Sequence, residues 1–190
     1  MQDITYSLTG TTTNGMFKIY SAKRYFLQLN GVNITNADGP AINVQAEKKT
    51  SVELMAGTQN TLTDGAVYAA ALNGNGEEED QDAAFFSEAK LVFSGSGSLT
   101  INGNGLSQHA LCSDDVIEIS SGNIIVTKAV KDGIHANDGI FISGGTVNVT
   151  AAGDAIDGDE GNILISGGSI TTLNAAADVK GISCDSTLVV

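Results

Sequence analysis

The sequence is poor in several residue types, and each shortage narrows the possible folds. Its 190 residues contain no tryptophan, one proline and two cysteines, but 23 glycines. High glycine content with a single proline and regular apolar spacing excludes collagen-like and linker sequences, and favours many tight turns between strands. No apolar run is long enough to cross a membrane, so we expect no membrane insertion. The length predicts one domain, and 42% hydrophobic residues are enough to fill its core.

Basic residues are also scarce. The chain has 9 lysines and arginines against 22 acids, which gives a formal net charge of −13. Because phosphate binding needs clustered lysine and arginine, this balance argues against a nucleic-acid partner. It permits a cation as partner, although an acidic surface can also serve only to keep a secreted protein soluble.

The two ends of the sequence predict a trimmed domain. Residues Ile4-Thr5-Tyr6-Ser7-Leu8 alternate like a strand close to the start, with no export signal before them, as expected of a cytosolic protein or of a chain cut after its signal. At the other end, Leu188-Val189-Val190 matches the earlier run Ile163-Leu164-Ile165, but no cap follows, and solenoids need caps over their end repeats. We therefore expect one domain over residues 1–190, cut at one or both ends.

The main positive signal is an internal repeat. Its three most regular copies are Ser121-Gly122-Asn123-Ile124-Ile125-Val126, Ser143-Gly144-Gly145-Thr146-Val147-Asn148-Val149 and Ser166-Gly167-Gly168-Ser169-Ile170-Thr171-Thr172. The interval between equivalent glycines is 23 residues, from Gly122 to Gly145 and from Gly145 to Gly168. The apolar runs are short, β-branched and bounded by turn residues, which indicates strands. About 23 residues with three short strands make one coil of a parallel β-helix, and the leucine-asparagine pattern of leucine-rich repeats is absent.

A small residue followed by a large apolar one opens each coil. These pairs are Ala41-Ile42, Ala84-Phe85, Ala110-Leu111, Gly133-Ile134, Ala155-Ile156 and Gly181-Ile182. With one less regular coil before them, the sequence predicts an all-β, single-stranded parallel β-helix of about seven coils. Ile134, Ile156 and Ile182 should stack in one core column. The first interval is nearly doubled and holds the acidic run Glu77–Asp82, which we expect to be a solvated loop or a loop that joins a metal or ligand site.

The register of the repeat argues against a disulfide. Cys112 aligns with His135, Asp157 and Ser183, whereas Cys184 lies one column further on. The two cysteines are then about three layers apart, roughly 14 Å at ~4.8 Å per layer. A disulfide requires Cα atoms within about 7 Å, so we expect two free cysteines.

The order of the motifs resembles a known family. The segments that carry the resemblance are Leu29-Asn30-Gly31-Val32-Asn33-Ile34, Gly39-Pro40-Ala41-Ile42, Asn60-Thr61-Leu62-Thr63-Asp64-Gly65, Ser94-Gly95-Ser96-Gly97-Ser98-Leu99-Thr100-Ile101 and Lys131-Asp132-Gly133-Ile134-His135-Ala136-Asn137-Asp138. With the two Ile-Ser-Gly-Gly units that follow, the sequence is similar to the bacterial carbohydrate-binding β-helix family. Its members are polysaccharide-lyase-like proteins that bind cellulose and acidic sugars. The resemblance covers roughly residues 20–188.

That resemblance implies several properties. The fold would be a right-handed, pectate-lyase-like parallel β-helix with calcium ions on its coils. The protein would be exported or displayed at the cell surface, and its partner would be a polysaccharide that it binds without established cleavage. Two departures are present, since the chain lacks an export signal and has fewer coils than a complete member. The resemblance does not name the sugar or the oligomeric state.

Aligned coils stack acidic residues in columns. One column holds His109, Asp132, Asp154 and Lys180. The column three residues later in each coil holds Cys112, His135, Asp157 and Ser183. The columns five and six residues later hold Asp114, Asn137, Asp159 and Asp185, and Asp115, Asp138, Glu160 and Ser186, respectively. Two carboxylates about 5 Å apart repel by some 3 kcal/mol at an effective dielectric of about 20. Stacked acids therefore destabilise the fold unless a proton or a cation lies between them.

Oxygen ligands of this kind select a hard cation. Calcium accepts six to eight oxygens, and the loop Asp154-x-x-Asp157-x-Asp159-Glu160 offers several between glycines. We predict Ca²⁺ between adjacent coils, bound by carboxylates drawn from Asp114, Asp115, Asp132, Asp138, Asp154, Asp157 and Asp159. The alternative is that these aspartates bond backbone N–H groups in turns. Zinc is less favoured, because only His109 and His135 offer nitrogen and the cysteines are not in a ligand spacing.

Three functions remain open at the level of sequence. The first is a calcium-dependent, non-catalytic carbohydrate-binding module; the others are a polysaccharide lyase acting on uronic-acid polymers and a structural surface protein. A lyase needs a cationic base, for which Lys131 and Lys180 are candidates, although both can simply balance local negative charge. Without tryptophan, only Tyr20, Tyr25, Tyr68, Phe85 and Phe86 could stack on sugars. We favour the binding module, with calcium bridging the protein to acidic sugars.

Overall fold

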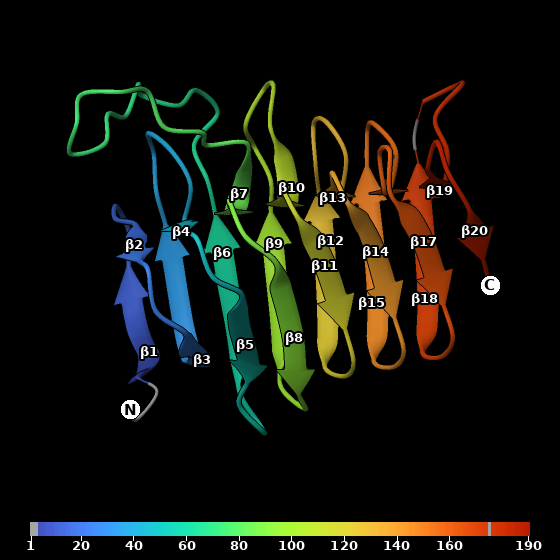
Figure 1. Ribbon diagram of the computed structural model, residues 1–190, viewed down its shortest axis with the longest axis horizontal. Coiled ribbons are helices and arrows are strands. Elements are labelled where there is room, and N and C mark those ends of the chain that lie inside the picture. The colour runs from blue at the N-terminus through green and yellow to red at the C-terminus, as the bar shows by residue number, and fades with distance from the viewer. Residues whose placement is uncertain (1–3, 175) are drawn as a thin grey trace.

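The computed structural model describes residues 4–174 and 176–190, and every regular element in these ranges is a β-strand. The predicted all-β parallel β-helix is confirmed. Each full coil contributes three strands, and equivalent strands of successive coils pair in parallel (Figure 1). The described part of the chain contains no helix that is long and apolar enough to span a bilayer.

One face of the solenoid is a seven-stranded sheet. Its strands, in spatial order, are β2 (Phe17–Ser21), β4 (Ile42–Ala46), β7 (Ala83–Ser87), β10 (His109–Ser113), β13 (Ile134–Ala136), β16 (Ile156–Asp157) and β19 (Ile182–Ser183). Six of these strands, all except β2, begin at or beside the small-plus-apolar pairs identified in the sequence. Their seven layers agree with the predicted number of coils.

The other two faces belong to a thirteen-stranded sheet that bends through β3 (Tyr25–Thr35). The first half of β3 continues into β5 (Thr50–Leu54), β8 (Leu91–Gly95), β11 (Val116–Ile119), β14 (Gly139–Ile142), β17 (Asn162–Ile165) and β20 (Leu188–Val189). The second half continues into β6 (Gln59–Thr63), β9 (Ser98–Asn102), β12 (Asn123–Lys128), β15 (Thr146–Ala151) and β18 (Ser169–Asn174). Strand β1 (Ile4–Thr12) pairs with both halves of β3 at the amino-terminal end.

The core consists of apolar columns, as the repeat predicts. Ile134 pairs with Ile156 and Ile156 with Ile182 in consecutive layers, which confirms the expected column. Ile134 and Ile156 are fully buried, whereas Ile182 packs against the core from the last layer and is only partly buried. Because each parallel pair fixes the register of the next layer, the apolar positions of successive strands stack into a continuous dry interior.

The repeated glycines form the corner between the second and third strands of a coil. Gly122, Gly145 and Gly168 have φ angles of 98°, 86° and 94°, a conformation that favours glycine. The corners also stack closely: a Cβ at Gly145 would lie 2.6 Å from the carbonyl oxygen of Gly122. Both the conformation and the contact with the preceding coil therefore require glycine at this point of the repeat.

The close packing at this corner predicts that a single methyl group added there destabilises the fold. We expect Gly145→Ala to lower the free energy of unfolding by about 2 kcal/mol or more, because it adds left-handed strain to a backbone clash. Urea denaturation followed by circular dichroism measures the change. The control is Gly74→Ala, whose Cβ would meet no atom within 4 Å. Equal stability of the two variants would contradict the corner argument.

Candidate functional site

The outer surface of the seven-stranded sheet carries the polar columns. Register pairing places Asn43, Phe86, Cys112, His135, Asp157 and Ser183 side by side in consecutive strands. The alternating neighbours Ile42 and Leu111 belong to the core, so this column points away from it. The predicted alignment of Cys112, His135, Asp157 and Ser183 is confirmed. Both cysteines are free, as the register predicts.

A long loop, residues 64–82, leaves the solenoid after β6 and returns at β7 (Figure 1). Its start is fixed by Asp64, whose buried carboxylate accepts hydrogen bonds from the Asn104 amide at 2.5 Å, the Gly105 amide at 3.0 Å and the Tyr68 hydroxyl at 2.6 Å. Burial raises the pKa of Asp64, and these donors counteract part of the shift. The loop is thereby held to the next coil.

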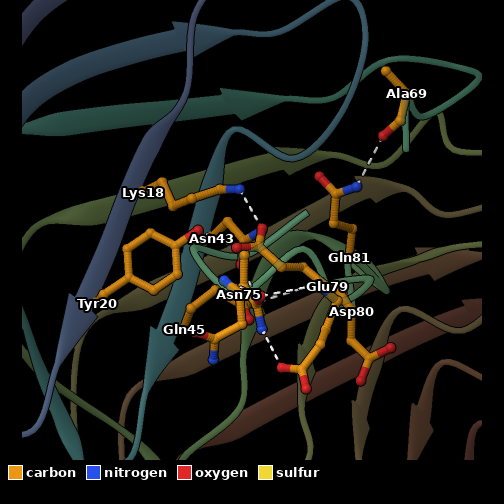
Figure 2. A network of polar contacts seen from close by, with 11 residues as sticks. Lys18, Tyr20, Asn43, Gln45, Ala69, Asn75, Glu79, Asp80 and Gln81 are labelled. Atoms are coloured by element: carbon orange, nitrogen blue, oxygen red, sulfur yellow. Dashed lines mark hydrogen bonds and ion pairs between the residues drawn. The ribbon is translucent and has the colours of Figure 1, made fainter. Parts of the chain in front are cut away.

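The end of the loop is held by a polar network on the first coils. Glu79 accepts hydrogen bonds from the Lys18 ammonium and the Tyr20 hydroxyl, both on β2 (Figure 2). Gln45 on β4 donates from Nε2 to the backbone oxygen of Asp80 at 3.0 Å. The acidic run is therefore not a freely solvated loop: Glu79 pairs with the sheet and brings Asp80 over it.

Three carboxylates meet beside this anchor. Asp80 from the loop, Glu88 directly after β7 and Asp114 directly after β10 each offer an oxygen within 4.8 Å of the other two. We call these residues the acidic triad. Asp114 was expected as a metal ligand from the sequence, whereas Asp80 and Glu88 were not. Glu88 follows Phe86 by two residues, as Asp114 follows Cys112, so the column alignment was the signal that could have found it.

The acidic triad is electrostatically unfavourable without a cation or a proton. Burial raises the pKa of Asp114, and the charges of Glu88, Asp82 and Asp80 add to the shift, to about 7. Burial, with the charges of Asp80 and Asp82, also raises the pKa of Glu88. A divalent cation between these oxygens would remove the repulsion that adds to both shifts.

A hollow of about 420 Å³ adjoins the acidic triad. Tyr20, Gln45, Glu47, Glu88 and Asp115 are among its lining residues. Tyr20 is 56% exposed, whereas Tyr25, Phe85 and Phe86 are buried and Tyr68 is bonded to Asp64. Of the five aromatic residues considered in the sequence, Tyr20 is therefore the exposed one, and it lines this hollow. Glu88 belongs to both the hollow and the acidic triad, which joins the two into one site.

The seven aspartates predicted as calcium ligands do not gather at one point. Oδ1 of Asp132 accepts a hydrogen bond from the Asp154 amide at 2.7 Å, and Oδ1 of Asp154 accepts one from the Lys180 amide at 2.6 Å. Oδ1 of Asp115 accepts one from the Val116 amide at 2.7 Å. These three carboxylates thus bond backbone N–H groups in turns, the alternative that the sequence left open. Each of these hydrogen bonds involves only Oδ1, so Oδ2 of the same carboxylate takes no part in it.

The remaining four take different places. Asp114 belongs to the acidic triad, and Asp157 pairs with His135, with 2.9 Å between Oδ2 and Nδ1. Asp138 donates its amide to the carbonyl oxygen of Asp115, and Asp159, with φ of 45°, accepts the Asp185 amide at its carbonyl oxygen. The potential metal-binding groups found among the described residues include Asp114, Asp132 and Asp157, but not Asp115, Asp138, Asp154 or Asp159.

A second polar cluster lies further along the same face. The rings of His109 and His135 stack with centroids 4.1 Å apart and 15° between their planes. Burial alone lowers the pKa of His135, but its hydrogen bond to Asp157 and the charges of Asp157 and Asp132 raise that pKa above its ordinary value. Burial lowers the pKa of His109 despite the nearby Asp132. The two stacked imidazoles therefore differ in their preference for a proton.

The fold defines a β-solenoid protein of the parallel β-helix class. Over residues 2–190 the chain matches the model of a family described as carbohydrate-binding domain-containing protein, and it belongs to that family. A protein of the same description from Acetivibrio thermocellus is 31% identical over 123 residues, which are 64% of this chain and 41% of the relative. The chain thus spans less than half of that relative's length.

A solved structure shares the architecture. It is the gadolinium derivative of the polysaccharide lyase-like protein from C. thermocellum, with a TM-score of 0.81 and 25% sequence identity. The similarity covers 98% of this chain and 84% of that chain. The predicted resemblance to polysaccharide-lyase-like, carbohydrate-binding β-helix proteins is confirmed.

The raised pKa of Asp114 predicts a pH dependence of stability. The folded carboxyl has a pKa of about 7 and an ordinary value of 3.8, so the folded state binds more protons between these values. In chelator, we expect the stability contribution of Asp114 to decrease as the pH rises from about 4 to about 7. Asp114→Asn should flatten this part of a plot of melting temperature against pH. Asp185→Asn, on the same face, is the control and should retain the wild-type slope.

Proposed function

We propose that the protein binds an acidic polysaccharide of plant type through the acidic triad and the adjoining hollow, with Ca²⁺ between carboxylates of the protein and of the sugar. We further propose that it does so at the cell exterior and without cleaving the chain. The observation that carries the proposal is the convergence of Asp80, Glu88 and Asp114 beside an open hollow with one exposed aromatic ring.

The donor chemistry fits calcium. All three side chains of the acidic triad are carboxylates, and calcium prefers six to eight oxygen ligands from carboxylates, carbonyls and water. Three protein carboxylates do not complete such a shell, so positions stay open for uronate and water oxygens. Asp80, Glu88 and Asp114 would hold the ion, and the ion would supply the positive charge that the site lacks.

The charge of the chain supports the same role for the ion. A protein of net charge −13 repels a polyuronate, and nothing in the acidic triad can bind a carboxylate directly. Lys18, the cation nearest the anchor, is already paired with Glu79. A divalent cation shared between protein and sugar converts this repulsion into attraction. Carbohydrate binding is supported by the family, and acidic sugars by the donor set.

Binding to polygalacturonate tests the proposal. We expect retention on an affinity gel in millimolar calcium and its loss in chelator. Asp114→Asn and Glu88→Gln should each weaken binding by about tenfold or more, equivalent to about 1.4 kcal/mol. Asp159→Asn lies on the same face outside the acidic triad and serves as the control.

Other outcomes of this experiment separate the alternatives. Calcium-independent binding that survives both triad variants would contradict the proposed ion bridge. Release of unsaturated, ultraviolet-absorbing uronides would show a lyase instead. If no acidic or neutral polysaccharide is retained in the presence of calcium, the structural role is favoured.

Tyr20 offers a second test of the hollow. Its ring is exposed at the hollow, whereas its hydroxyl holds Glu79 and thereby the loop. We expect Tyr20→Ala to weaken polysaccharide binding by about 0.5–1.5 kcal/mol through lost ring contacts. Tyr20→Phe keeps the ring and removes only the hydroxyl, so it should bind more tightly than Tyr20→Ala in isothermal titration calorimetry. Equal losses in both variants would assign the effect to the loop anchor and not to the ring.

A further inference from the structure

The cluster around His135 contains acceptor atoms that face one another. His135 Nε2 lies 3.1 Å from Oδ1 of Asn137, and Nδ2 of Asn137 is directed at Oδ1 of Asp114, 3.5 Å away. With the amide in this orientation, Oδ1 of Asn137 can only accept, so Nε2 of His135 carries the hydrogen. The lone pair of a neutral His135 is then on Nδ1, which faces Oδ2 of Asp157 at 2.9 Å. A proton or a cation must lie between these two atoms.

His109 presents a second nitrogen to the same place. Its side chain is 2% exposed, and Nδ1 has no hydrogen-bond partner among the described residues. Nδ1 nevertheless lies 3.2 Å from Oδ2 of Asp132, and the same oxygen is 4.0 Å from Nδ1 of His135. A buried imidazole nitrogen without a partner carries a desolvation cost that a ligand would remove. Oδ1 of Asp132, held by the Asp154 amide, fixes the carboxylate in this orientation.

We propose that His109, Asp132, His135 and Asp157 form a binding site for one zinc-class transition-metal ion. The site is chemically distinct from the acidic triad, because imidazole nitrogens with carboxylates suit zinc and its neighbours, whereas calcium takes oxygen ligands. Sequence reasoning disfavoured zinc because only two histidines offer nitrogen and the cysteines are not in a ligand spacing. The fold brings them into one stack.

The distances are close to those of a tetrahedral ion. Zinc bonds of about 2.0–2.1 Å place donor atoms about 3.3 Å apart. Three of the four histidine–carboxylate pairs lie within 4.0 Å of each other, with Nδ1 to Oδ2 separations of 2.9, 3.2 and 4.0 Å, and the pair of His109 and Asp157 does not. The nearly parallel rings cannot both aim a lone pair at one ion, so one ring must turn on binding. His109 is the ring that can turn without losing a hydrogen bond at Nδ1, whereas Asp157 and Asn137 hold His135 at both of its nitrogens.

The ion would cross-link neighbouring coils along the solenoid. His109 begins β10, Asp132 and His135 belong to the coil of β13, and Asp157 ends β16. One ion would therefore join three successive coils that are otherwise held by backbone pairing and the core. The hydrogen bond from His135 Nε2 to Asn137 is the kind of outer contact that orients a metal-binding histidine.

Metal titration of the chelator-treated protein tests the site. Calorimetry with ZnCl₂ should give one saturable equivalent, and Zn²⁺ should raise the melting temperature. Co²⁺ at the site should give the visible absorption of a tetrahedral complex, which Zn²⁺ abolishes and excess Ca²⁺ does not. Asn137→Ala removes the orienting contact to His135 together with the 3.5 Å contact to Asp114, and it should weaken zinc binding by about ten- to hundredfold. His135→Gln should weaken it further.

Two controls make the result specific. Cys112→Ser changes a buried neighbour of His109 and His135, and Glu88→Gln changes the acidic triad; both should keep full zinc affinity. Every variant is first checked for a strand-type circular dichroism spectrum. The proposal is overturned if zinc does not bind in one equivalent, if His135→Gln binds it normally, or if Cys112→Ser loses it. Polysaccharide retention by His135→Gln should be unchanged, which separates this site from the proposed function.

Discussion

The parallel hydrogen-bond ladder is the constraint on which the rest of this structure depends. It places each residue about 4.8 Å from its equivalent in the next coil, so whatever one coil carries is repeated in register. For apolar residues the consequence is favourable, as the fully buried Ile134 and Ile156 show. For acidic residues the same ladder forces like charges together. The site chemistry of this protein follows from how that repulsion is relieved.

The structure relieves the repulsion between stacked carboxylates in different ways along one face. Asp132 and Asp154 direct an oxygen to a backbone amide of the following coil, which turns a repulsive column into a chain of hydrogen bonds. Asp157 faces an imidazole instead of another carboxylate. The three carboxylates of the acidic triad instead face one another, and there the pKa of Asp114 rises to about 7. These mutually repelling charges lie beside an open hollow, where a cation and a charged ligand would relieve the repulsion.

The sequence alone was sufficient to predict the structural features that follow from the repeat. Fold class, number of coils, the isoleucine column and the alignment of Cys112 with His135 and Asp157 all follow from one period, and the ladder confirms them. It was not sufficient for residues 64–82, which have no counterpart in other coils and therefore no column to be aligned with. Asp80 reaches the acidic triad only because Glu79 is bonded to Lys18 and Tyr20 on a strand about sixty residues away. The orientation of Asn137, which decides where His135 carries its hydrogen, is likewise a property of three-dimensional contacts.

The inserted loop also explains why the site lies where it does. A solenoid of identical coils presents the same surface at every layer, so it cannot by itself mark one place for a ligand. The loop breaks this equivalence between β6 and β7: Glu79 and Asp80 contact the strands of the first layers, and Asp80 adds one carboxylate to a column that already contains two. Beyond its reach the outer face returns to the pattern of the repeat. The repeat thus supplies a rigid array of acidic positions, and a single irregular segment selects which of them become a binding site.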